Sequence, residues 1–186
     1  AARAERIVAA LSRNRVELTT TFAGSEIFVF GAVKREAPPR PEDAPLDVVV
    51  AVEGPSHPVV VRRKARTFGV WTNAEALLID EAPSFYAVAA TGPLEEILTA
   101  TEDLRHRVGI EVQVRAVGLP VAGRERDAFT DAVIRLRREA GLYVEAPGGV
   151  SMAEDTLFTA RFALPANLVE GEYRARTFLI REGEVI

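Results

Sequence analysis

The residues that could carry acid–base or nucleophilic chemistry are few in this chain of 186 residues. The chain has no cysteine, and His57 and His106 are its only histidines. Ser56 precedes His57, but the Gly-x-Ser-x-Gly elbow of a serine hydrolase is absent. Neither histidine has a partner at ligand spacing, so the sequence predicts no metal site. We therefore expect no catalytic residue and no enzyme, and a hydrolase that uses Ser56 and His57 is an alternative hypothesis.

A run of basic residues is the most informative polar feature, Arg62-Arg63-Lys64-Ala65-Arg66. On an extended strand Arg62, Lys64 and Arg66 share one face, and this positive stripe could hold a small anion, a lipid headgroup or an acidic partner. The other explanation is an edge strand whose charges protect it against further pairing. Trp71 follows closely, either in the core or beside the stripe. We name these three basic residues and Trp71 as candidate anion- or partner-binding residues.

Composition excludes several other classes of function. The net charge of -4 and the isoelectric point near 5.4 argue against a nucleic-acid binder, which needs a basic footprint. Neither a Walker loop nor a Gly-x-Gly-x-x-Gly fingerprint is present, so we expect no cofactor. No segment approaches the roughly 18 to 20 apolar residues that span a bilayer.

Strands must position these residues over most of the chain. Apolar and polar residues alternate from Leu157 to Leu164 and again from Tyr173 to Leu179, which predicts a C-terminal β-hairpin. Residues 27–33 are apolar on both faces, so we expect a central strand that is covered on both sides. Further short strands, interrupted by turn residues every 8 to 12 positions, are typical of a sandwich.

The period changes to helical between Gly92 and Gly141. One helix is expected from Pro93 to Val108 and a second from about Gly123 to Ala140, with a strand-like piece at residues 110–114 between them. The predicted fold is mainly β, an immunoglobulin-like β-sandwich with a two-helix insertion. Its N-terminal strands occupy residues 1–91, the insertion 92–141, and the completing strands 142–186. An N-terminal sandwich followed by a small α+β domain is the rival architecture.

Three stretches resemble an alphaproteobacterial family of single-pass transmembrane proteins of unknown function. They are Phe22-Ala23-Gly24 to Val29-Phe30-Gly31-Ala32-Val33, Phe68-Gly69-Val70-Trp71, and Leu164-Pro165-Ala166-Asn167 to Gly171-Glu172-Tyr173. The resemblance implies a cleaved secretion signal, a periplasmic domain, and one membrane helix that lies beyond Ile186. Genes of such a family neighbour permeases similar to sulfite exporters, which suggests an accessory role in anion transport.

The leading hypothesis is a non-enzymatic interaction domain, tethered on the periplasmic side of the inner membrane, whose partner is an envelope protein such as a permease. The second is a domain that binds a small anion at the stripe of Arg62, Lys64 and Arg66. Nothing in the sequence names the partner or the anion.

Overall fold

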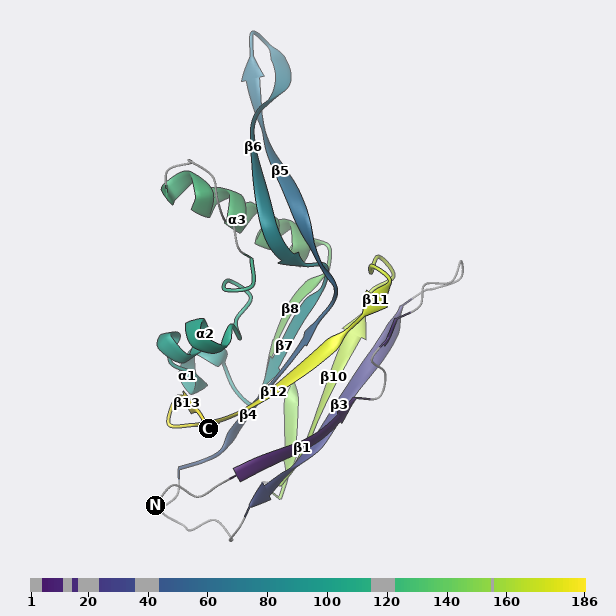
Figure 1. The fold of residues 1–186 in the computed structure, drawn as a ribbon, viewed down its shortest axis with the longest axis vertical. Helices are drawn as coiled ribbons and strands as arrows, with labels where there is room; N and C mark the ends of the chain where they lie inside the picture. Colours follow the sequence, from purple (N-terminus) through teal and green to yellow (C-terminus); the bar gives the residue numbers. More distant parts are fainter. Residues whose placement is uncertain (1–4, 12–14, 17–23, 36–43, 115–122, 155) are drawn as a thin grey trace.

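The computed structural model describes residues 5–11, 15–16, 24–35, 44–114, 123–154 and 156–186. Two sheets pack face to face (Figure 1). The first has the order β1 (Glu5–Leu11), β3 (Ser25–Arg35), β10 (Leu157–Leu164), β9 (Val150–Ala153). The second has the order β13 (Glu184–Val185), β12 (Arg174–Arg181), β4 (Asp47–Glu53), β7 (Tyr86–Ala90), β8 (Tyr143–Pro147). The predicted mainly β sandwich is therefore confirmed.

The remaining elements are a short strand pair, a long hairpin and three helices. β2 (Arg15–Val16) pairs with β11 (Gly171–Glu172), and β5 (Ser56–Thr67) pairs with β6 (Val70–Pro83). The helices are α1 (Leu94–Ile97), α2 (Ala100–His106) and α3 (Gly123–Glu139), and all three lie between β7 and β8 in sequence.

The core lies between the two sheets. β4 and β7 are the central strands of the second sheet, and their apolar residues are buried on both faces. Opposite them, β10 alternates strictly between exposed and buried residues, so that Phe158, Ala160 and Phe162 face the core. The ring of Phe85 packs against that of Tyr173 at 6.0 Å between centroids.

β3 is central in its sheet, as predicted, but it is covered on one side only. Ile27, Val29 and Val33 are buried, whereas Phe28 and Phe30 point outward and are exposed. The prediction of two covered faces was wrong because it assumed that every apolar residue of the strand is buried within this chain.

The predicted C-terminal hairpin was also wrong in its pairing. Both strands exist and alternate as expected, but β10 pairs with β3 and β9 in the first sheet, and β12 pairs with β4 and β13 in the second. The segment between them crosses from one layer to the other. Alternation along a strand reports which face is buried and carries no information about the neighbouring strand.

The helical insertion is confirmed, with two differences. The first predicted helix is divided, because Leu98 leaves the helical conformation after α1 and Thr99 begins α2 by accepting a hydrogen bond from the backbone N–H of Glu102. Residues 110–114 form turns and not a strand. The insertion returns the chain to the second sheet, where β8 runs parallel to β7.

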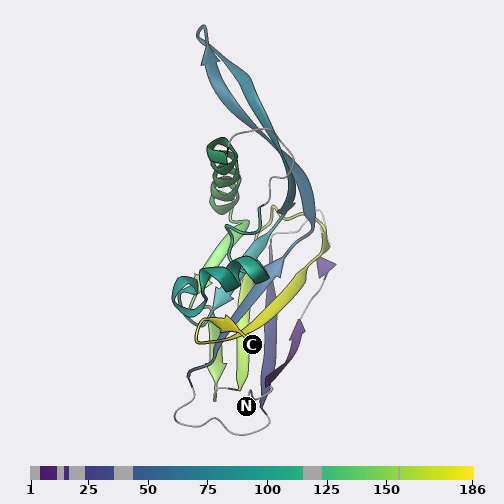
Figure 2. The same ribbon diagram turned by 60° about the vertical axis from the view of Figure 1, so that its left-hand side comes forward.

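The β5–β6 hairpin projects well beyond the sandwich in both views (Figures 1 and 2). The sequence predicted short strands interrupted by turns, but in this region the pieces join into two strands of 12 and 14 residues. At about 3.3 Å per residue, the hairpin is roughly 40 Å long. Partway along β5, the guanidinium of Arg63 lies 6.0 Å from the ring centre of Phe129 on α3.

Candidate functional site

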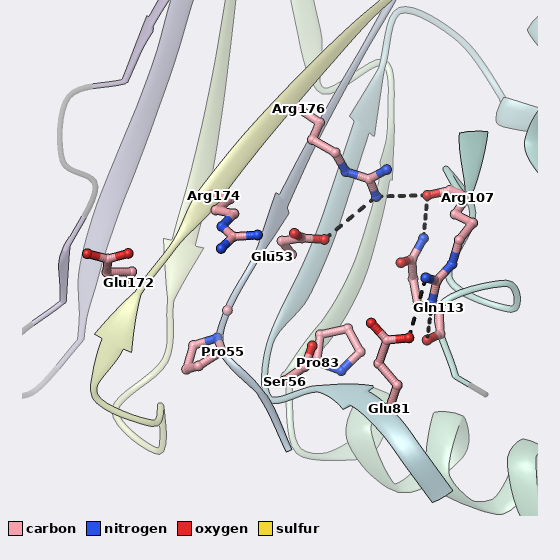
Figure 3. Close-up of a pocket in the computed structure, with 11 residues that line it drawn as sticks. Glu53, Pro55, Ser56, Glu81, Pro83, Arg107, Gln113, Glu172, Arg174 and Arg176 are labelled. Carbon is pink, nitrogen blue, oxygen red and sulfur yellow. Dashed lines mark hydrogen bonds and ion pairs between the residues drawn. The ribbon is translucent and has the colours of Figure 1, made fainter. Parts of the chain in front are cut away.

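A cavity of about 460 Å³ lies at the base of this hairpin, where β4 ends and β5 begins. We call it the root pocket (Figure 3). Its walls come from four parts of the chain: the β4–β5 junction, the end of β6, strands β11 and β12, and the segment after α2. The lining residues are Glu53, Gly54, Pro55, Ser56, Glu81, Pro83, Arg107, Gln113, Glu172, Arg174 and Arg176.

Arg176 joins the second sheet to the segment after α2. One of its terminal nitrogens donates to the carbonyl of His106 at 2.9 Å, and the other donates to that of Arg107 at 2.8 Å and to the hydroxyl of Tyr86 at 3.2 Å. The carboxylate of Glu53 lies 3.8 Å away. The Tyr86 hydroxyl in turn donates to the carbonyl of Val108 at 2.6 Å, and burial raises its pKa above the ordinary value. Arg176 is thus held largely by structural contacts.

Arg107 also holds its surroundings together. Its backbone is left-handed, with φ of 52°, at the residue that ends α2. Its guanidinium donates to the carbonyls of Val112 at 3.4 Å and Gln113 at 3.2 Å, and lies 3.5 Å from the carboxylate of Glu81. The Gln113 amide donates back to the Arg107 carbonyl. This exchange fixes the turns that form one wall of the root pocket.

Arg174 differs from these two arginines. It is exposed on β12, two residues before Arg176 and therefore on the same face of the strand. Figure 3 shows its side chain directed into the root pocket beside Glu53, while Glu172 points away. Within the part of the chain that the structure describes, the Arg174 guanidinium has no ion pair or hydrogen bond. Five free N–H donors suit a carboxylate or another oxyanion.

The residues that suggested chemistry do not form a catalytic arrangement. Ser56 lines the root pocket, but His57 follows it on the same strand, so the two side chains point to opposite faces. His106 is half-buried, because its Nε2 lies 3.3 Å from Glu102 and its ring packs edge-on against Phe178. No group of three or more metal-ligating side chains occurs among the described residues.

The predicted stripe lies on the hairpin, outside the root pocket. Arg62 is exposed on β5 opposite Ala76. The backbones of Lys64 and Arg66 continue the same strand, opposite Asn73 and Trp71. The side chains of these four residues lie outside the described part of the structure. The register shifts between Arg63 and Lys64. Whether the stripe binds anything stays a prediction.

Sequence reasoning missed the root pocket. Arg174 and Arg176 were noted only as the water-facing side of a strand, because such alternation is the common pattern for a half-buried strand. The position of Arg174 opposite Glu53, and of Arg176 opposite Ala51, depends on the pairing of β12 with β4, which the sequence pattern does not encode.

Residues 6–186 match a family described as "Putative transmembrane protein (Alph_Pro_TM)". The chain belongs to this family. The predicted resemblance is therefore confirmed, and the Alph_Pro_TM match covers both sheets, the hairpin and the helical insertion. No helix within the described ranges has the length and apolar character needed to cross a membrane.

Two further comparisons add little to the Alph_Pro_TM assignment. An 88-residue stretch is 28% identical to the 3-phosphoshikimate 1-carboxyvinyltransferase of Vesicomyosocius okutanii subsp. Calyptogena okutanii (strain HA). That stretch is 47% of this chain and 20% of the enzyme. No solved structure matches the chain.

Proposed function

We propose that this chain is a non-enzymatic interaction domain of a membrane-tethered protein, which acts on the periplasmic side of the inner membrane as an accessory to a permease. One observation carries the proposal: the first sheet has an apolar face that nothing in the described chain covers. Membership in a family of transmembrane proteins supports a partner in the same membrane.

The apolar face is continuous across three strands. Ala32 of β3 lies opposite Val8 of β1 and Leu157 of β10, so these side chains share one side of the sheet. Phe30 and Phe28 follow on the same side of β3. Val8 is 61% exposed, Leu157 55%, Phe30 48% and Phe28 41%. We call Val8, Phe28, Phe30 and Leu157 the outer face.

An outer face of this kind favours a protein partner. Single exposed apolar residues are ordinary on a protein surface, but contiguous patches mark interaction sites. Two phenylalanine rings can act as interface anchors, because aromatic side chains bury a large area on binding. Arg161 lies at the edge of this surface, with its guanidinium 5.2 Å from the centre of the Phe28 ring. Protein interfaces commonly have such polar residues around an apolar centre.

Photo-crosslinking tests this proposal. A benzophenone amino acid at Phe30 of the full-length protein, in its native membrane, is expected to form an adduct with a polytopic permease. The matched control is the same substitution at Leu136, which is 53% exposed on α3 and lies far from the outer face. The double variant Phe28→Ser, Phe30→Ser should abolish copurification of the permease while thermal stability changes little. The same adducts from Phe30 and Leu136, or copurification that survives the double variant, would contradict the proposal.

Binding of a small anion is the second candidate, and it is favoured by the Arg174 guanidinium in the root pocket, which has no ion pair or hydrogen bond among the described residues. The stripe of Arg62, Lys64 and Arg66 is the alternative location. The Glu53 and Glu81 carboxylates offset two of the pocket's three positive charges, and the third lining carboxylate, Glu172, points away from the other side chains (Figure 3), so we expect a singly charged oxyanion or a carboxylate there.

Thermal unfolding with sulfite, sulfate, phosphate and acetate separates the two locations. A ligand that binds only the folded state raises Tm. At a ligand concentration of 100 times Kd, it increases the free energy of unfolding by about 2.7 kcal/mol. We expect Arg174→Ala to abolish the rise and Arg62→Ala to leave it unchanged. The reverse pattern would place the anion on the hairpin, and the absence of any rise at millimolar anion would refute both locations. Arg135→Ala on α3 controls for the general loss of a surface cation.

A further inference from the structure

The tip of the β5–β6 hairpin has a backbone that its sequence makes unfavourable. Thr67 pairs with Val70, so Phe68 and Gly69 form a two-residue turn. Both turn residues have positive φ, 50° for Phe68 and 85° for Gly69, as a type I′ turn requires. Asn-Gly is the preferred pair in such a turn, whereas a bulky aromatic residue with positive φ is a strained exception.

The side chain of Phe68 does not pack against the described part of the fold, so burial does not offset this strain. It is 102% exposed, and Val70 beside it is 64% exposed. An apolar ring at the end of a long projecting arm is unfavourable in water. Because backbone strain and full exposure coincide at Phe68, we infer that its side chain contacts another molecule.

Charge identifies the surface that the tip would meet. The sequence has no Asp or Glu from Gly54 to Ala74, and four cations fall within residues 62–66. The rest of the chain then has 23 minus 4, or 19, basic residues against 27 acidic ones, a balance of -8. The positive charge of this acidic protein is thus concentrated behind an apolar tip. Arg62 is exposed and has no partner among the described residues.

We propose that the tip of the β5–β6 hairpin inserts into the headgroup region of an anionic lipid bilayer, with Phe68 and Val70 in the interface and Arg62, Lys64 and Arg66 on the phosphates. Apolar and aromatic residues next to basic ones are typical of interfacial membrane binding. A convex tip with two apolar side chains is too small for a specific protein interface, which buries about 800 Å² per partner. A bilayer needs no complementary groove.

This inference goes beyond the proposed function, because it concerns lipid at the hairpin tip and not a protein at the outer face. The two surfaces belong to different sheets. Either interaction can therefore fail in its own experiment without affecting the other.

The chain provides its own probe for the test. Trp71 is the only tryptophan, three residues from Phe68 in sequence. We expect vesicles of phosphatidylglycerol to shift its emission to shorter wavelength, and brominated lipids to quench it. Vesicles of phosphatidylcholine alone should bind at least about tenfold more weakly, and added salt should weaken binding to the anionic vesicles.

Phe68→Asn separates membrane binding from folding. It creates the preferred Asn-Gly turn, so Tm should stay the same or rise, while affinity for anionic vesicles falls about tenfold or more. Leu136→Asn is the matched control for the loss of an exposed apolar residue, and it should bind as the natural chain does. The triple variant Arg62→Gln, Lys64→Gln, Arg66→Gln should lose the dependence on anionic lipid.

Three results would overturn the proposal. The first is an unchanged Trp71 emission with anionic vesicles. The second is a Phe68→Asn variant that melts earlier and binds normally, which would assign Phe68 a structural role. The third is a Trp71 response that appears only when the vesicles contain a permease, which would make the tip a protein contact.

Discussion

Replacing Phe158 by alanine is expected to lower the free energy of unfolding by about 3–5 kcal/mol. The Phe158 side chain is 1% exposed and lies on β10 opposite Gly31 of β3. A Cβ added to Gly31 would come within 2.6 Å of the Phe158 ring, so the ring occupies the space that the glycine leaves free. Alanine would open a cavity between the two sheets that neither strand can close. Urea unfolding followed by circular dichroism measures the loss.

Phe30→Ala is the matched control for this prediction. It removes the same ring from the same sheet, but Phe30 points outward and is 48% exposed. The loss should therefore be about 1 kcal/mol or less. Losses of equal size for Phe30 and Phe158 would mean that β3 is buried on both faces in solution.

Alkaline pH is expected to destabilise the fold steeply above about pH 10. The Tyr143 hydroxyl donates to the carbonyl of Pro83 at 2.8 Å, and burial raises its pKa from 10.0 to about 12. Burial raises the pKa of Tyr86 and Tyr173 as well, and these three are all the tyrosines in the chain. In the unfolded chain each tyrosine loses its proton near pH 10, while the folded protein retains it. The stabilisation is thus complete below pH 10 and is lost as pH rises from there toward the folded-state pKa, at about 1.4 kcal/mol per pH unit for each tyrosine.

A pH titration followed by tyrosinate absorbance and circular dichroism tests this expectation. Tyrosinate should appear together with the loss of structure, because few hydroxyls are free to ionise in the folded state. Tyr143→Phe should lower the free energy of unfolding at neutral pH by about 1 kcal/mol. Above pH 10 it should reduce the fall in the free energy of unfolding by about 1.4 kcal/mol per pH unit, the contribution of one tyrosine. Three tyrosines that ionise near pH 10 in a protein that keeps its circular dichroism would contradict the burial described here.

The strands and helices were largely predictable from the sequence, because each is determined by local periodicity. The alternation of Phe158, Ala160 and Phe162 identified the buried face of β10, and the helical spacing between Gly123 and Ala140 located α3 within one residue. Pairing was not predictable. β10 and β12 follow each other in sequence and join different sheets, because a strand's own pattern does not select its neighbour.

The candidate sites were predictable only in part. The basic run drew attention to residues 62–66. The joining of several expected short strands into one hairpin was not predicted, because Phe68-Gly69 is not one of the residue pairs that favour a two-residue turn. The outer face was missed because Phe28 and Phe30 were expected to be buried. In both regions the failed prediction marks apolar residues that are exposed in the described part of the structure.

The pairing of distant strands also limits when this protein can fold. Ile27 lies opposite Phe162, and Val50 opposite Thr177, so neither sheet can be completed until nearly the whole chain is present. Such a high contact order predicts slow folding, because the entropy of closing long loops must be overcome before native contacts form. The topology of this sandwich therefore delays completion of both sheets until its last strands have been synthesised.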